Sequence, residues 1–207
     1  MEAKVKINDP RSLKELVKSL GGKLKYAREE MNIFYDPSKR LLDRKGEVLR
    51  LRKELYVTTG GAAVVFGNTE AVSMTFKGKR LKGKLKIREE NEFNVSDFEQ
   101  ARSLLVALGY KEYFRFEKKR ESFTLDRCLI EFDTLPYLGH FVEVEGTNEK
   151  SIKKILKSLG LKDSALITDG YGSLLWDDAK KHRRSKKVAE FAHGITWTSE
   201  NFEGKVR

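Results

Sequence analysis

Cysteine, proline and histidine are scarce in this chain, and it has no long apolar run. Of its 207 residues, one is cysteine, three are proline and three are histidine. Cys128 alone excludes an intramolecular disulfide and a thiolate zinc cluster, and its place in the run CLIEF predicts a small buried side chain. The chain also has no N-terminal apolar segment of the secretory kind and no membrane-length span, so we expect a cytoplasmic protein without membrane contact.

Charge, by contrast, is abundant. Lysine and arginine number 42 against 31 aspartates and glutamates, which gives a net charge of +11 and an isoelectric point of about 9.6. This excess predicts a polyanionic ligand such as a nucleotide, polyphosphate, nucleic acid or acidic surface. Because the carboxylates share segments with the cations, metal-assisted phosphate chemistry is favoured over simple coating of a phosphate backbone. The length suits one sizeable α/β domain, with two small domains as the alternative.

Helix signals recur along the chain. Asp9-Pro10 provides an N-cap and a first-turn proline, SDFE at 96–99 resembles a capping box, and glycines follow each apolar stripe. We therefore expect amphipathic helices at 9–20, 96–108 and 149–159, and a last helix that opens at 170–176.

Strand signals fill the rest, and most combine an apolar with an ionic phase. The expected strand segments are 1–7, 32–42 with its Asp-Pro turn, 47–55, 73–78, 84–95 and 118–146, the last with strands on either side of a Pro-Tyr-Leu-Gly turn. The ionic phase contains Glu2, Lys4, Lys6, Arg50, Arg52, Lys77, Arg88, Glu90, Glu92, Lys118, Arg120, Asp133, Glu143 and Glu145.

Two arrangements fit these phases. The ionic faces can point to solvent, or, if helices cover the apolar faces, they can line the interior of a curled sheet. We predict the second: an α+β fold with a closed antiparallel barrel, a charged lumen and helices packed on the outside. Such a lumen needs water, metal ions and a highly charged ligand, and a triphosphate with divalent cations meets that need.

The motifs resemble those of the CYTH family, the triphosphate tunnel metalloenzymes, which includes class IV adenylyl cyclases, thiamine triphosphatases and inorganic tripolyphosphatases. The resemblance extends from Glu2 to about Trp176. The matching segments are Glu2–Lys6, FYDPSKRLL with Arg50 and Arg52, Thr75 with Lys77, Arg88 with Glu90 and Glu92, Lys118 with Arg120, and Gly139 with Phe141, Glu143 and Glu145. The resemblance implies an eight-stranded antiparallel tunnel.

The resemblance to the CYTH family also implies a site that binds a triphosphate and a divalent metal ion. The implied triphosphate ligands are Lys6, Arg50, Arg52, Lys77, Arg88, Lys118 and Arg120. The implied ligands of Mg²⁺ or Mn²⁺ are Glu2, Glu143 and Glu145. The candidate catalytic residues are Lys6, Glu90 and Glu92. For Glu90 and Glu92, metal binding, water orientation and pairing with arginines stay open. The chain departs from the family at Lys4, where the second glutamate of the first motif is expected. An ammonium there removes an oxygen ligand and adds repulsion, which leaves a shifted metal site, altered substrate choice or lost catalysis as outcomes.

The function expected from this resemblance is metal-dependent hydrolysis of a triphosphate, either inorganic tripolyphosphate, thiamine triphosphate or a nucleoside triphosphate. One alternative is a class IV adenylyl cyclase that makes cyclic AMP and pyrophosphate from ATP. A second is a catalytically impaired triphosphate-binding protein. All three use the same positive side chains to neutralise phosphate oxygens. Either a monomer or a homodimer is compatible with the sequence.

The C-terminal end differs from the rest. KKHRRSKK at 180–187 contains six lysines and arginines, which indicates a solvated, loosely packed tail or a contact with nucleic acid. We expect a CYTH triphosphate-tunnel domain at 1–178 and a basic C-terminal extension at 179–207. Two further side chains have open roles. His140 is expected in a solvated turn near the Glu143 strand, and Tyr171 is expected either to close one end of the tunnel or to pack in the core.

Overall fold

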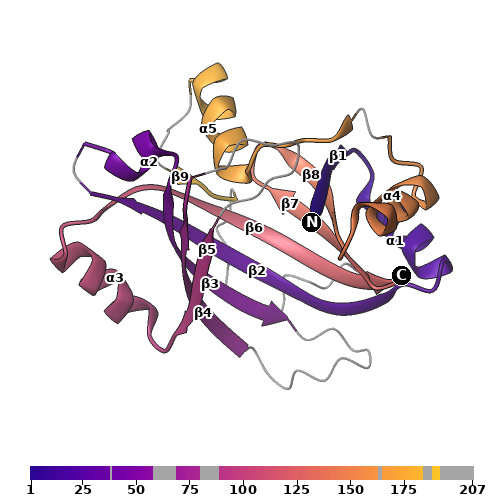
Figure 1. Cartoon of the computed structure of the whole chain (residues 1–207), viewed down its shortest axis with the longest axis horizontal. Coiled ribbons are helices and arrows are strands. Elements are labelled where there is room, and N and C mark those ends of the chain that lie inside the picture. Colours follow the sequence, from indigo (N-terminus) through magenta and orange to yellow (C-terminus); the bar gives the residue numbers. More distant parts are fainter. Residues whose placement is uncertain (38, 58–68, 80–88, 163–164, 184–187, 192–207) are drawn as a thin grey trace.

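A computed structural model describes residues 1–37, 39–57, 69–79, 89–162, 165–183 and 188–191. Within these ranges, one mostly antiparallel sheet is combined with α-helices, as the sequence predicts (Figure 1). The strands are β1 (Glu2–Ile7), β2 (Lys23–Asp36), β3 (Val48–Val57), β4 (Thr69–Lys77), β5 (Glu90–Val95), β6 (Lys111–Leu125), β7 (Cys128–Leu135), β8 (Gly139–Glu145) and β9 (Val188–Ala189). The helices are α1 (Pro10–Ser19), α2 (Leu41–Lys45), α3 (Phe98–Ala107), α4 (Glu149–Ser158) and α5 (Tyr171–Lys181).

Strands β2 and β6 form the centre of the sheet and run along most of the molecule (Figure 1). The sheet order is β1-β8-β7-β6-β2-β3-β4-β5, and β9 pairs in parallel with the start of β6. The register places Glu2 opposite Glu145 and Lys4 opposite Glu143, and it places Thr75 opposite Glu92. Because side chains alternate between faces, these pairs put the predicted ionic phase on one side of the sheet.

The other face is apolar and is covered by three of the predicted helices. Helices α1 and α4 pack beside each other on β1, β8, β7 and β6 through Val17, Ile155 and Leu156. Helix α3 covers β2, β3 and β4 at the opposite end through Phe98, Ala101 and Leu105. Burial of each large side chain contributes about 1.5–3 kcal/mol relative to exposure, so these contacts orient the ionic phase away from the helices.

Caps begin and end these helices nearly as predicted. The Asp9 carboxylate accepts hydrogen bonds from the backbone of Arg11 and Ser12, and Pro10 occupies the first turn of α1. For α3, however, the capping residue is Asp97 rather than Ser96, since Asp97 accepts the bond from the backbone nitrogen of Gln100. Short helix α2 follows the Asp-Pro turn, where the sequence predicts only a turn.

Helix α5, the last of the predicted helices, lies on the face that the barrel prediction assigned to the lumen. Helix α5 packs on the same side of the sheet as the ionic residues, not on the apolar side, so the prediction that all helices lie outside is wrong for α5. The cause is that this face becomes apolar near the ends of β2, β6 and β7. The residues packed there are Phe34, Phe114, Phe116, Leu135, Phe141, Tyr171 and Leu175.

The predicted closed barrel also differs from the described sheet, which is open between β1 and β5. Among the described residues, no pairing joins these two strands. Part of the reason is local. The outer edge of β1 is occupied by the segment before α5, where Val5 bridges to Leu166 and the Ile167 nitrogen donates to the Lys4 carbonyl at 2.8 Å. The pairing that would close the sheet is therefore replaced on this edge.

Segment 118–146 contains a hairpin that the sequence pattern did not indicate. Strand β6 ends at Leu125 and β7 begins at Cys128, and the two turn residues Asp126 and Arg127 both have positive φ, 48° and 62°. Paired positive φ values match the twist of a two-residue hairpin turn. The Pro-Tyr-Leu-Gly turn follows between β7 and β8, as predicted.

The region beyond 178 is attached to the sheet where it is described. Helix α5 continues to Lys181, Val188–Ala189 pairs with β6, and the Phe191 nitrogen donates to Glu117 at 3.0 Å. The boundary between a domain at 1–178 and an extension at 179–207 stays a prediction, and four residues of the basic run, 184–187, lie outside the described ranges. None of the described helices has the length and apolar character needed to cross a membrane.

Candidate functional site

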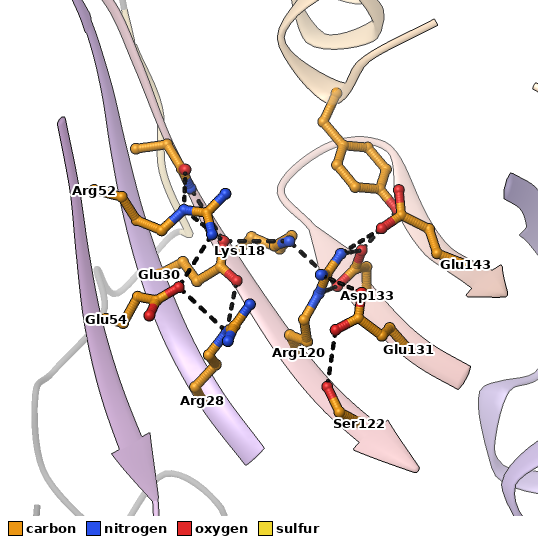
Figure 2. Close-up of polar contacts among 12 residues, drawn as sticks. Arg28, Glu30, Arg52, Glu54, Lys118, Arg120, Ser122, Glu131, Asp133 and Glu143 are labelled. Atoms are coloured by element: carbon orange, nitrogen blue, oxygen red, sulfur yellow. Dashed lines mark hydrogen bonds and ion pairs between the residues drawn. The ribbon is translucent and has the colours of Figure 1, made fainter. Parts of the chain in front are cut away.

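Those predicted site residues that the structure describes lie on what we call the ionic face, the side of the sheet opposite α1, α3 and α4. Figure 2 shows that charged side chains from neighbouring strands of this face point toward one another and form a continuous network of ion pairs. Three groups can be distinguished, centred on Arg120, on Glu30 and on Arg50.

The Arg120 group is rich in carboxylates. The buried Arg120 guanidinium donates to Asp133 through Nε at 2.6 Å and through Nη2 at 2.5 Å, and it also contacts Glu131 and Glu143. Burial alone lowers the pKa of Arg120, but the surrounding carboxylates raise it well above its ordinary value. One arginine thus contacts three acids, and four of its five N–H donors are engaged by them.

Lys4 and Tyr171 complete this group. The Lys4 ammonium lies 3.1 Å from the Glu143 carboxylate, donates to the Asp169 carbonyl at 3.0 Å and sits 4.0 Å from the centre of the Tyr171 ring. The Tyr171 hydroxyl donates to Asp133 at 2.7 Å. Burial tends to raise the pKa of Glu143, but the nearby positive charges outweigh it and lower the pKa to about 2. Tyr171 therefore packs in the core and also anchors α5 to the ionic face.

The Glu30 group lies between β2, β3 and β6. Glu30 is fully buried, with Arg28 at 2.8 Å, Lys118 at 3.2 Å and Arg52 at 3.7 Å from its oxygens (Figure 2). Burial raises the pKa of Glu30, yet these cations lower it well below its usual value. Lys118 also lies 3.5 Å from Asp133, so it links the Glu30 and Arg120 groups.

Arg52 and Arg28 are held within the Glu30 group by polar side chains. Arg52 donates to Asn32 at 3.0 Å and to Glu54 at 3.1 Å. Arg28 donates to the Tyr56 hydroxyl at 3.2 Å, and Glu30 and Glu54 raise its pKa against the effect of burial. The negative charge nearby therefore holds both guanidinium groups in fixed positions.

The Arg50 group, on β3, β4 and β5, has less compensation for its cations. Arg50 donates through Nη2 to Thr75 at 2.9 Å and to Glu92 at 3.3 Å, and Lys77 lies 2.8 Å from Glu90. Both acids are half-exposed, with 51% and 47% of their side chains accessible. The buried Nε of Arg50 has no hydrogen-bond acceptor among the described residues. The acids of the Arg50 group are therefore more exposed than those that surround Arg120.

The pKa values of Arg50 and Lys77 are shifted in the opposite direction to that of Arg120. Burial, reinforced by the neighbouring Arg52, lowers the pKa of Arg50 to about 9. Burial also lowers the pKa of Lys77. Burial therefore opposes the positive charge of Arg50 and Lys77 more than their neighbouring acids offset it, whereas the acids around Arg120 outweigh the effect of burial.

The remaining predicted residues lie at the margins. Lys6 on β1 is exposed, with its ammonium 5.9 Å from the Phe141 ring centre, and Glu2 and Glu145 are exposed and opposite each other across β1 and β8. Arg88 lies outside the described residues. His140 is in β8 rather than in a turn and lies 3.0 Å from the Thr134 hydroxyl; burial lowers its pKa.

A resident metal ion does not fit the expected ligands Glu2, Glu143 and Glu145. Glu143 is already paired with the Lys4 ammonium and the Arg120 guanidinium, so its oxygens face two fixed cations. In the described ranges, no group of three or more His, Cys, Asp or Glu side chains is arranged to hold a metal. Hard divalent cations require several oxygen ligands with negative charge not already neutralised, and this set does not provide them.

Sequence reasoning missed Arg28, Glu30 and Glu54. Arg28 and Glu30 precede the expected strand at 32–42, in the first half of β2, where four consecutive residues from Ala27 to Glu30 are buried. A strand that is covered on both faces does not alternate, so periodicity gives no signal there. Glu54 lies in the expected strand 47–55, and its place on the phase of Arg50 and Arg52 was the available signal.

Comparison with known proteins identifies the class to which this open, charge-lined sheet belongs. The family profile of the CYTH domain matches residues 1–171. The chain therefore belongs to the CYTH domain family, which confirms the resemblance found in its motifs.

Individual proteins that are similar to this chain agree with its place in the CYTH domain family. A candidate adenylate cyclase of Methanocaldococcus jannaschii, MJ0240, is 29% identical over 180 residues, which cover 83% of this chain and 95% of the relative. The structure of the PH1819 protein from Pyrococcus horikoshii is similar, with a TM-score of 0.70, 25% identity and coverage of 86% and 98% of the two chains.

A plant protein has the same fold at lower identity. HpAC1 from Hippeastrum, a candidate adenylyl cyclase described as having a dominant triphosphatase activity, matches with a TM-score of 0.59, 16% identity and coverage of 89% and 96%. The expectation of an enzyme, with a hydrolase and a lyase as the options, agrees with these names.

Proposed function

We propose that the protein is a phosphohydrolase that binds a triphosphate on the ionic face and hydrolyses its terminal phosphate. The observation that supports this most directly is the Arg50 group. There, Arg50 and Lys77 have lowered pKa values, and the buried Nε of Arg50 has no acceptor in the described ranges. A triphosphate oxygen supplies an acceptor for this Nε and adds negative charge to that of Glu90 and Glu92.

The three groups have different roles in this proposal. Arg50 and Lys77 contact the phosphate oxygens directly, and Lys118 and Arg52 contribute from the Glu30 group. Arg120, whose donors are engaged by carboxylates, positions Lys118 through Asp133 rather than binding phosphate itself. Lys6 and Arg88 stay predicted ligands, at the margin of the face and outside the described residues.

Glu92 is the proposed residue that orients the attacking water. It accepts a hydrogen bond from Thr75 at 2.6 Å, and its pKa is lowered, because Thr75 and the cations outweigh the effect of burial. It therefore stays ionised near neutral pH and can accept a proton from a bound water. Water attacks the terminal phosphorus, the bridging P–O bond breaks, and the shortened phosphate chain leaves with the electron pair.

The divalent cation of the proposed reaction, Mg²⁺ or Mn²⁺, enters as part of the triphosphate complex. In many phosphate-processing enzymes, Mg²⁺ is held mainly by substrate phosphates and water, with one or two carboxylates. This agrees with the lack of a suitable three-carboxylate set among the residues of the ionic face that the structure describes.

Cyclisation of ATP is the second candidate, since the M. jannaschii relative is named for that activity. The plant protein with the same fold is described as mainly a triphosphatase, which supports hydrolysis as the first choice. A triphosphate-binding protein without turnover is the third possibility, raised by Lys4.

One product assay separates all three. Tripolyphosphate and ATP are incubated in parallel with Mg²⁺ and with Mn²⁺, and the products are resolved as orthophosphate, pyrophosphate and cyclic AMP. Hydrolysis predicts orthophosphate from tripolyphosphate, and cyclase activity predicts cyclic AMP with pyrophosphate from ATP. Binding detected by calorimetry without any product would contradict an enzymatic role.

A further inference from the structure

The ammonium of Lys4 has an unusual environment for a lysine on a phosphate-binding face. Only 3% of the residue is exposed. Its contacts are a Glu143 oxygen at 3.1 Å, the Asp169 carbonyl at 3.0 Å and the face of the Tyr171 ring at 4.0 Å. An ammonium has three N–H donors, and these three partners account for them. Lys4 therefore has no donor left for a phosphate oxygen.

The position of this ammonium is fixed from both ends. The backbone of Lys4 pairs with Glu143 across β1 and β8, and its carbonyl accepts a bond from Ile167 at 2.8 Å. The side chain then contacts Asp169 and Tyr171, which follow Ile167 at the start of α5. The Lys4 side chain therefore links the Glu143 carboxylate on β8 to the segment that precedes α5.

The oxygens around Lys4 are of the kind that bind a hard divalent cation. A carboxylate and a backbone carbonyl are typical ligands of Mg²⁺, Mn²⁺ and Ca²⁺. A metal ion and an ammonium cannot share them, because two cations within about 4 Å of each other in a buried site repel by several kcal/mol.

We propose that the Lys4 ammonium is a built-in cation that occupies the place of a divalent metal ion at Glu143 and Asp169. The protein then excludes metal from this part of the ionic face, and divalent ions reach the site only with the triphosphate. The entry of divalent ions together with the triphosphate rests on the proposed function. The exclusion of metal by Lys4 does not rest on it, because that exclusion concerns the protein without substrate.

The direct test counts Mn²⁺ bound per chain without substrate, with free Mn²⁺ measured by electron paramagnetic resonance. Lys4→Glu removes the ammonium and adds oxygen ligands beside Glu143, so we expect this variant to bind one more Mn²⁺ per chain than the unchanged protein. Lys150→Met, which removes an exposed lysine of α4, is the matched control and should bind the same number as the unchanged protein. An equal count for Lys4→Glu and the unchanged protein would overturn the proposal.

A second variant decides the question even if Lys4→Glu does not fold, which circular dichroism will reveal. If Lys4 excludes metal, Glu143→Gln leaves the Mn²⁺ count of the otherwise unchanged protein as it is. Loss of one bound Mn²⁺ in Glu143→Gln would show that metal already binds there, and the proposal would be wrong. Phosphate release from tripolyphosphate, measured separately, tests the proposed function, so the two can fail independently.

Discussion

The two ends of the ionic face use the same residue types for opposite purposes. On β6, β7 and β8, Arg120 is surrounded by three carboxylates, and its pKa is raised. On β3, β4 and β5, Arg50 has one half-exposed acid as its ion-pair partner, its Nε has no acceptor within the described part of the chain, and its pKa is lowered. The first arrangement is neutralised by the protein itself, and we propose that the second is completed by an external anion.

This contrast limits what a motif can say about function. Arg50 and Arg120 belong to motifs of the same family, and both lie on the predicted face. Their neighbours differ, however, so in the proposed function Arg120 is a structural cation, Arg50 is a ligand-binding cation, and equal roles in phosphate binding are not expected. Variants at the two ends should therefore affect different properties.

The largest expected effect is on stability at Arg120. Arg120→Met leaves Glu131, Asp133 and Glu143 with a deficit of positive charge in a buried site, which should lower the free energy of unfolding by about 3–5 kcal/mol. Arg50→Met, with the same change of side chain, should cost no more than about 1 kcal/mol because positive charge is disfavoured there. Urea unfolding followed by circular dichroism gives both values. Equal losses would remove the proposed distinction.

Acid should reveal the same distinction through Glu143. Its folded-state pKa of about 2 lies below the ordinary 4.5, so ionised Glu143 stabilises the protein above about pH 4.5, and this contribution is lost as pH falls toward 2. The loss is on the order of 3 kcal/mol.

The measurement compares the free energy of unfolding at about pH 7 and about pH 3. The unchanged protein should lose more stability on acidification than Glu143→Gln, which has no carboxyl group to titrate at that position. Glu92→Gln is the control at the other end. Because Glu92 is half-exposed, its removal should change the acid sensitivity much less. An acid sensitivity unaltered by Glu143→Gln would contradict the structural role of the Arg120 group.

Much of this face could be predicted from alternation alone. Lys4, Arg50, Lys77, Arg120 and Glu143 all lie where the period of two places them, because each belongs to a strand with one apolar side. The three amphipathic helices were predictable for a related reason, since an apolar stripe beside a cap leaves few alternatives.

The pairing of charges was not predictable. Which acid meets which cation depends on strand register and on rotamers, and the chain offers many acids and cations on one phase. The place of α5 was hidden as well, because the face changes from ionic to apolar along β2 and β6, at Phe34 and Phe114. The hairpin turn at Asp126 and Arg127 was not predictable either, since both residues have positive φ and neither is a glycine.

Activity should respond in the opposite order to stability. Arg50→Met removes the proposed phosphate donor and should lower kcat/KM for tripolyphosphate by about 10²-fold, in the range found for loss of one preorganised donor. The readout is orthophosphate release with protein that circular dichroism shows to be folded. Arg28→Met, at a guanidinium bonded to Glu30 and Tyr56, is the matched control and should have a smaller effect on kcat/KM. A larger loss in Arg28→Met than in Arg50→Met would move the binding site toward the Glu30 group.

The smallest expected effect is a change in pH dependence at Lys77. Burial lowers its pKa below the ordinary 10.5, and a bound triphosphate favours the charged form. Affinity should therefore be greatest while the free protein still has the ammonium, and it should fall as pH rises through the lowered pKa. We expect a loss on the order of tenfold between about pH 7.5 and about pH 10, measured by calorimetry with tripolyphosphate.

Lys77→Arg distinguishes this effect from general alkaline weakening of the site. A guanidinium has a higher ordinary pKa than an ammonium, so the variant should lose less affinity than the unchanged protein over this range, even if its absolute affinity differs. Parallel losses would mean that another group titrates, and Lys77 would then have no special place in the proposed phosphate site. A flatter profile for Lys77→Arg would instead tie the binding of phosphate to a cation whose pKa burial lowers in the protein without ligand.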